Sequence, residues 1–275
     1  MVFTISFGGC LFVIGPRGVL GITPISAAQL PFVYLASLAG PSLSGILLIG
    51  LFHRKEGLRD LRSRLFRWRV GARWYLVALL TAPLLMTTIL FALSLTSPAY
   101  IPTIVITDHK AGLLLIGIGL GLVVPFLEEL GWTGFAVPEL RKRYGILVTG
   151  LIAGLLWGAW HFPLFSGAAS SARTVPPALY IAVLLFSWLL PFRVLMVWVY
   201  DRTESLLLAM LMHLSIVVGV FVIVPQTMPA VALVTFDLVF GAALWLVVAA
   251  VALANGGHLS RQLFPNSNIP SGGQI

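Results

Sequence analysis

The chain has 275 residues, of which 59% are hydrophobic and only 9% are charged, and its mean hydropathy is +1.02. This balance excludes an ordinary soluble domain and is typical of an integral membrane protein. The formal net charge is +8, but the basic residues gather between apolar runs, so they indicate membrane topology and not nucleic-acid binding. Cys10 is the only cysteine, which excludes an intrachain disulfide.

Membrane-spanning helices need roughly 20 apolar residues each, so the chain has room for seven or eight. Residues 1–26 are an apolar segment broken at 15–18, which predicts a short or partial eighth helix. Residues 255–275 are rich in Gly, Ser, Asn and Pro and predict a flexible polar tail. We therefore predict an all-α fold, a polytopic transmembrane helical bundle over 27–254, in a multi-pass protein of the cell membrane. The expected spans are 27–52, 74–97, 111–137, 144–162, 178–200, 204–224 and 229–253.

The segment 53–73 carries eight Lys or Arg residues against Glu56 and Asp60, which predicts a cytoplasmic location. It either simply anchors the topology or lies as an amphipathic helix on the anionic inner leaflet, because Leu58, Leu61 and Leu65 recur at helical spacing. Alternation of the spans then distributes the remaining loop charges between the two sides. The cytoplasmic side receives Arg141, Lys142, Arg143, Arg202 and Arg261, and the opposite side receives Arg17, Lys110 and Arg173.

Two adjacent acids, Glu128 and Glu129, interrupt the apolar run 111–137. A carboxylate near the bilayer centre costs about 2.5 to 3.5 kcal/mol on insertion scales, so an acid in this position predicts a functional site with a partner. Consecutive residues point about 100° apart around a helix. One carboxylate can therefore face a cavity while its neighbour faces elsewhere.

The candidate partners of these acids are His161 and His213. The midpoint between Glu128 and His161 falls at 144–145, where a turn between antiparallel helices is expected. The two residues are therefore equally far from the turn along their helices, which places their side chains at the same depth. His213 lies about ten residues into the span 204–224, roughly 15 Å deep at 1.5 Å per residue. We expect the three groups to converge within a core at about 111–224. Either histidine taken alone is equally consistent with a hydrogen bond between helices.

A carboxylate and two imidazoles in a partly dry pocket can activate water in two ways. Glu128 can take a proton from water that attacks a peptide carbonyl, while the histidines stabilise the developing oxyanion. Alternatively, Glu128, His161 and His213 form the three-ligand set of a catalytic Zn²⁺ site, with Glu129 as the base. The chain has no H-E-x-x-H motif, so the sequence does not require the metal.

Three segments resemble motifs of the CPBP family of intramembrane proteases, which comprises CAAX prenyl endopeptidases, bacteriocin-processing enzymes and abortive-infection relatives. The first motif is a glutamate pair followed by aromatic and arginine positions, the second an aromatic four residues before a histidine, and the third a Tyr-x-x-Thr-x-Ser entry into a helix with a histidine. The matching segments are EELGWTGFAVPEL at 128–140, WGAWHFP at 157–163 and VWVYDRTESLLLAMLMHLS at 197–215, preceded by a basic segment at 62–76.

The resemblance implies an endopeptidase that cleaves a membrane-embedded or lipid-anchored, CAAX-like peptide substrate, with a dependence on metal left open. Carried over position by position, Glu128 is the water-activating base, Glu129 its partner, and His161 and His213 complete the site. Two positions depart from the pattern: Thr133 replaces the usual arginine and Val217 an asparagine that helps hold the oxyanion. Arg193, which is charged within a span, either extends its side chain toward the cytoplasmic end of the span or pairs with a site glutamate in place of the missing arginine.

Alternatives to a protease remain open. A catalytically weak or inactive immunity or scaffold protein of the same fold would explain Val217. A proton-coupled transporter would use the buried acids as a relay, but the chain lacks paired Gly- or Pro-broken helices in two similar halves. Asp237 lies in the middle of the last span and either lines a cavity or pairs across helices. The sequence does not determine the oligomeric state.

Overall fold

The computed structural model describes residues 1–169, 174–255 and 259, and these residues form helices joined by short connections, without a strand. Arg173, Arg261 and all of the predicted polar tail except residues 255 and 259 lie outside the described residues. The helical elements are α1 (Val2–Val19), α2 (Leu30–Leu65), α3 (Ala72–Ser94), η1 (Pro98–Tyr100), α4 (Thr103–Ile106), α5 (Lys110–Glu129), η2 (Trp132–Ala136), α6 (Val137–Arg141), α7 (Ile146–Trp160), α8 (Phe162–Ala169), α9 (Pro177–Phe186), α10 (Leu189–Thr203), α11 (Leu206–Val218), η3 (Gly219–Ile223) and α12 (Ala230–Ala254).

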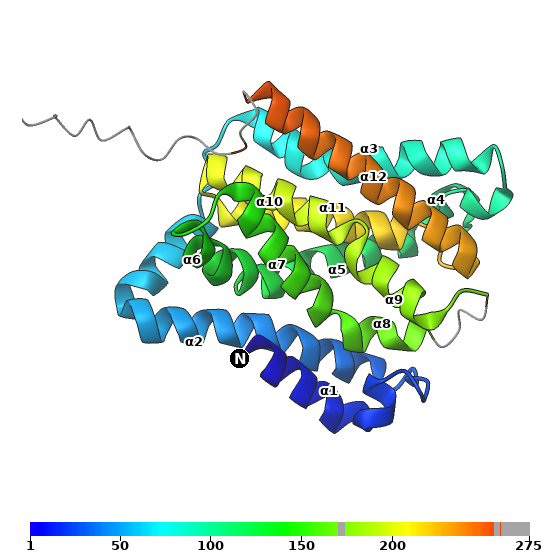
Figure 1. Cartoon of the computed structure of the whole chain (residues 1–275), viewed down its shortest axis with the longest axis horizontal. Helices are drawn as coiled ribbons and strands as arrows, with labels where there is room; N and C mark the ends of the chain where they lie inside the picture. The colour runs from blue at the N-terminus through cyan, green and yellow to red at the C-terminus, as the bar shows by residue number, and fades with distance from the viewer. Residues whose placement is uncertain (170–173, 256–258, 260–275) are drawn as a thin grey trace, which may run out of the picture.

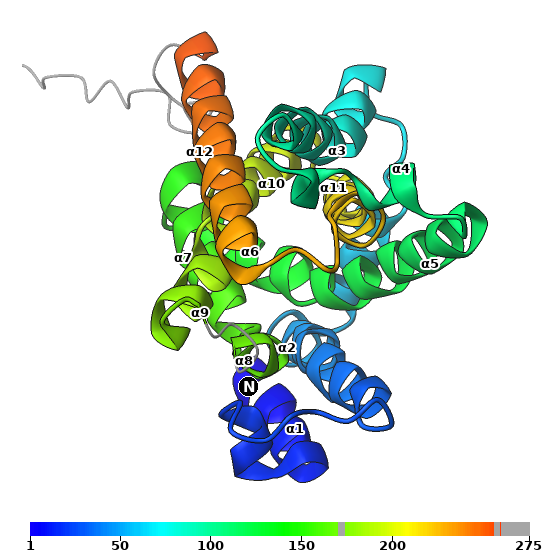
Figure 2. The same ribbon diagram turned by 90° about the vertical axis from the view of Figure 1, so that its right-hand side faces the viewer.

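Seven helical stretches among the described residues are long and apolar enough to cross a membrane, and α7 is a shorter apolar helix. The predicted polytopic helical bundle of seven to eight spans is therefore confirmed. The apolar N-terminal segment forms α1, an 18-residue helix broken at Gly15, where φ is 66°. In Figures 1 and 2, α1 and α2 lie on one side of the bundle, while α3, α10, α11 and α12 lie on the other.

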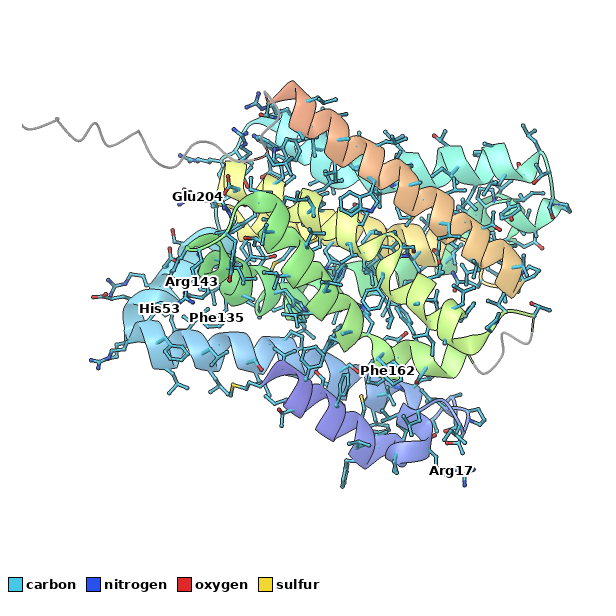
Figure 3. The ribbon with its side chains drawn as sticks, in the orientation of Figure 1. Arg17, His53, Phe135, Arg143, Phe162 and Glu204 are labelled. Carbon is cyan, nitrogen blue, oxygen red and sulfur yellow. The ribbon has the colours of Figure 1, made fainter. Side chains whose placement is uncertain are left out.

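The basic loops gather at one end of the bundle. Three ion pairs join them: His53 with Glu139 at 2.9 Å, Arg67 with Glu204 at 2.5 Å, and Arg141 with Asp201 at 2.5 Å. Figure 3 shows His53, Arg143 and Glu204 at this end and Arg17 at the opposite end. This grouping matches the distribution of charge that the topology predicts.

The segment 53–73 is more ordered than a loop. Helix α2 continues to Leu65 but breaks at Arg54, which has φ 53° and ψ −147°, and beyond the break it turns across the end of the bundle (Figure 1). Leu61 and Leu65 pack against Ile49 and Leu206 of the protein itself, so these two do not form a lipid-facing stripe. Leu58 stays 39% exposed.

Prolines interrupt two of the predicted spans. Pro191 has no N–H to donate to the carbonyl of Ser187, and the span predicted at 178–200 is divided there into α9 and α10. Pro138 likewise leaves the carbonyl of Gly134 free within the π-helical turn η2, and Arg64 donates to that carbonyl at 3.1 Å. The sequence predicts a helix end or kink at Pro138, because proline lacks the N–H donor, whereas the division at Pro191 was not predicted.

Glycines let α7 approach its neighbours closely. A Cβ at Gly150 would lie 2.6 Å from the Cα of Val194 in α10, and a Cβ at Gly158 would lie 2.4 Å from the carbonyl oxygen of Leu185 in α9. Small residues permit such backbone contact between membrane helices. The close packing brings the helix that ends at His161 against the helix that carries Arg193.

Candidate active site

Glu128 lies near the end of α5 and is 2% exposed. Its Oε2 accepts a hydrogen bond of 2.7 Å from the indole Nε1 of Trp157 in α7. The Trp157 ring lies 5.1 Å from the His213 ring and 5.2 Å from the His161 ring, measured between centroids. Trp157 therefore makes a polar contact with Glu128 as well as ring contacts with both histidines.

Glu129 is fully buried and turned toward a different set of partners. Arg193 Nη1 lies 2.9 Å from Oε2 and 3.1 Å from Oε1 of this carboxylate, and both side chains are 0% exposed. The Thr133 hydroxyl also donates to Oε2. Arg193 therefore pairs with a site glutamate, one of the two arrangements expected for it, and the residue at the position of the usual arginine, Thr133, contacts the same carboxylate.

The two histidines hold defined ring orientations. Nδ1 of His161 lies 2.8 Å from the carbonyl oxygen of Trp157, and Nδ1 of His213 lies 2.8 Å from Oε1 of Glu129. Carbonyl and carboxylate oxygens only accept, so Nδ1 donates in both cases. In each neutral ring Nε2 is then left as an acceptor. The His161 ring is stacked on Phe165, with centroids 5.2 Å apart and planes 11° apart.

Glu128, His161 and His213 line one cavity of about 140 Å³, together with Trp157 and Val217. Glu129 is not among the lining residues, so the two adjacent carboxylates face different surroundings. The rest of the wall is largely apolar and comes from α2, α5, α8, η3 and neighbouring positions: Tyr34, Leu38, Leu120, Val124, Leu164, Phe165, Trp188, Ile216, Val220 and Phe221.

The oxyanion donor expected from the family pattern is not supplied by nearby side chains of α11. Val217 presents an apolar wall, and the Ser215 hydroxyl donates to the carbonyl of Met212 at 2.7 Å. Asp237 of α12, 4% exposed, interacts with Trp188, which is itself part of the cavity wall. Asp237 itself is not among the residues that line the cavity.

The described residues do not form a ready metal centre. Across residues 1–169, 174–255 and 259, no three His, Cys, Asp or Glu side chains are grouped so that they could hold a metal ion. The Trp157 indole binds Oε2 of Glu128. The Glu129 carboxylate binds Nδ1 of His213. Glu128, His161 and His213 do not form a ready ligand cluster there, so we derive no step through zinc, and a dependence on metal stays a prediction.

Comparison with known protein families matches the part of the chain that contains this site. Residues 110–219 match the family described as type II CAAX prenyl endopeptidase Rce1-like. CAAX prenyl protease 2 of Methanococcus maripaludis is 26% identical over 199 residues, which cover 67% of this chain and 69% of that protein. These matches support membership of the CPBP family. They support the prediction of a multi-pass intramembrane protease of the CAAX type, and this family implies a membrane-associated peptide substrate and a lipid bilayer as its surroundings.

The site also has contacts that the motifs do not reveal. Trp160, next to His161, donates from Nε1 to the hydroxyl of Ser6 in α1 at 2.8 Å, and Ser6 donates to the carbonyl of Ser37 at 2.7 Å. Helix α1 lies outside the matched residues 110–219. No local pattern signals a contact between residues 154 positions apart.

Proposed function

We propose that the chain is an intramembrane endopeptidase that hydrolyses a peptide bond in a membrane-tethered, lipid-modified substrate through water activated by Glu128. The observation that carries the proposal is the shared cavity, in which Glu128, His161 and His213 meet. Carboxylate and imidazole groups within reach of one water molecule are sufficient for general acid–base hydrolysis.

The two carboxylates have separate roles. Glu128 faces the cavity and removes a proton from the attacking water, while Nε2 of His161 accepts the other hydrogen of that water and orients it. Oxygen attacks the scissile carbonyl, and the tetrahedral intermediate collapses when Glu128 returns its proton to the leaving amine. The Trp157 indole fixes the Glu128 carboxylate through the bond of 2.7 Å.

Glu129 acts through His213 and not directly on the substrate. Its carboxylate binds Nδ1 of His213 at 2.8 Å and is itself held by Arg193. When His213 is protonated, the carboxylate stabilises the imidazolium and Nε2–H donates to the oxyanion, which partly replaces the donor lost at Val217. Glu129 is therefore a positioning residue in this mechanism.

The apolar wall favours a substrate with a hydrocarbon group. Leu120, Val124 and Val220 line the cavity beside the polar groups, and such a surface suits an aliphatic chain. The relative from Methanococcus maripaludis is named a CAAX prenyl protease. We therefore infer that a prenylated peptide is the preferred substrate class.

The test compares a farnesylated CAAX peptide with its unmodified twin, each incubated with the purified full chain in detergent. Mass spectrometry is expected to detect the released C-terminal fragment from the farnesylated peptide at a rate at least tenfold higher. Cleavage of neither peptide by protein that unfolds cooperatively would reject the protease proposal. The scaffold or immunity reading, which Val217 favours, would then stand.

A further inference from the structure

A second cavity, of about 970 Å³, lies between the region of α2 around Arg54 and the segment formed by η2 and α6. It shares no lining residue with the candidate active site. Figure 3 shows two of its lining residues, His53 and Phe135, at the basic end of the bundle. The cavity is therefore at the end that the charge distribution assigns to the cytoplasmic face.

One wall of this cavity is apolar and reaches the lipid-facing surface. Phe52 and Phe135 are stacked with ring centroids 6.4 Å apart, and Ile49 lies beside them in the lining. Phe52 is 69% exposed and the neighbouring Leu51 is 70% exposed. Exposed side chains of this kind, next to a span, face hydrocarbon in a membrane protein.

The rest of the lining is largely charged. It includes the cations Arg54, Lys55, Arg64 and Lys142 and the acids Glu56, Asp60 and Glu139. Two acids are neutralised: Asp60 by Arg64 at 2.8 Å, and Glu139 by Lys142 at 2.6 Å together with His53 at 2.9 Å. Within the described part of the chain, Arg54, Lys55 and Glu56 form no ion pair, so the uncommitted charge is positive.

Arg54 also adopts an unusual backbone conformation. Its φ of 53° lies in the left-handed region, which costs a residue other than glycine of order 1 kcal/mol or more. An arginine at a position that favours glycine loses stability unless its side chain has a use. The strained residue lies at the boundary between the apolar and the charged parts of the lining.

We infer that this cavity binds the phosphate headgroup of an anionic phospholipid, with Arg54 and Lys55 against the phosphate and the Phe52–Phe135 wall against the start of an acyl chain. Basic pockets beside transmembrane helices on the cytoplasmic side are suited to anionic lipid headgroups. The cavity volume admits a headgroup, and the apolar and charged parts of the lining match the two parts of such a lipid. This inference does not depend on the proposed peptidase activity.

The experiment measures binding of phosphatidylglycerol to the full-length protein in detergent by native mass spectrometry, with phosphatidylcholine of the same acyl chains as comparison. The test variant is Arg54→Gly with Lys55→Gln, because glycine accepts the positive φ and removes the charge without adding strain. Each basic residue near an anionic surface contributes about 1 kcal/mol, so the affinity for phosphatidylglycerol should fall about 30-fold.

The matched control removes two exposed cations from the opposite end, Arg17→Gln with Lys110→Gln, and should retain wild-type affinity. Thermal unfolding in detergent alone checks that both variants fold. Equal affinity of the wild type for the two lipids, or undiminished phosphatidylglycerol binding by the Arg54 and Lys55 variant, would overturn the inference. Stabilisation by inorganic phosphate alone to the same extent would show a free phosphate site and reject the lipid, as would selective binding of an acidic peptide.

Discussion

Arg193 of α10 and Glu129 of α5 form an ion pair of 2.9 Å in which both side chains are fully buried. The guanidinium also lies over the Trp157 ring, 4.1 Å from its centroid. Arg193 thus contacts both Glu129, which binds His213, and Trp157, which binds Glu128. Arginine suits this double role because its planar group combines ion pairing with stacking.

Replacement of Arg193 tests whether it has taken over from the arginine missing at position 133. Arg193→Ala should lower kcat/KM at least about 100-fold, because Glu129 loses the cation that holds it against His213, and the uncompensated buried charge should also lower stability by roughly 3–5 kcal/mol. Arg193→Lys should be much milder. The measurement is peptide hydrolysis together with thermal unfolding, which reports lost stability separately.

A substitute arginine can then be placed at position 133, where the family motif usually has one. Thr133→Arg combined with Arg193→Ala restores a cation four residues beyond Glu129 on its own helical segment, and it should recover part of the lost activity. Wild-type activity in Arg193→Ala would remove the idea that the pair matters.

Trp157→Phe tests the bond that fixes Glu128. The change keeps an aromatic ring but removes the Nε1 donor, and hydrogen bonds to charged groups contribute about 1.5–3 kcal/mol. We therefore expect kcat to fall between about 10-fold and 100-fold with little change in KM. Trp132→Phe is the matched control, because the Trp132 indole nitrogen is buried and has no hydrogen-bond partner among the described residues. Equal effects of the two substitutions would contradict the role of Trp157.

Val217→Asn tests the missing oxyanion donor. Val217 lines the cavity, so an amide there would face the reacting carbonyl, and one oxyanion donor is worth about 10²–10³ in rate in other enzymes. An increase of kcat by about tenfold or more is expected, while Val217→Leu, which adds no donor, should give none. Unchanged kcat in a folded Val217→Asn variant would show that position 217 does not face the oxyanion.

Ser6→Ala tests the link between α1 and the site. It removes the partner of Trp160 and the bond to the Ser37 carbonyl, and each such bond contributes about 1 kcal/mol. The free energy of unfolding should fall by about 1–2 kcal/mol, with a smaller kcat because Trp160 adjoins His161. Ser44→Ala is the control, since the buried Ser44 hydroxyl has no hydrogen-bond partner among the described residues. Identical stability of the two variants would exclude the link.

Much of the fold could be predicted because each membrane-spanning helix corresponds to a continuous run of apolar residues in the sequence. Because Glu128 and His161 lie equally far along the chain from the turn at 144–145, the sequence also predicted that they come together. Which glutamate faces the cavity could not be predicted from the spacing, since it depends on the rotation of α5 relative to α7 and α11, and only the family resemblance indicated Glu128. The break at Arg54 was equally hidden, because nothing in the residue type indicates a positive φ.

The break at Pro138 had a local signal and was expected, and the same signal is present at Pro191. Pro191 and Pro138 each remove the donor for the carbonyl four residues earlier, at Ser187 and Gly134. The tertiary partner that satisfies Gly134, Arg64, is 70 residues away and had no such signal. The Ser6–Trp160 contact likewise depends on how α1 packs.

The central claim is that Glu128 activates the hydrolytic water, and the direct measurement is kcat/KM of Glu128→Gln on a farnesylated CAAX peptide. Glutamine preserves the shape of the side chain but cannot take up a proton from water. The expected loss is about 10²–10⁴-fold, the usual contribution of a general base, whereas Glu139→Gln, at the basic end of the bundle, should stay within about twofold of the wild type. A Glu128→Gln variant that hydrolyses the peptide as fast as the wild type would contradict the account.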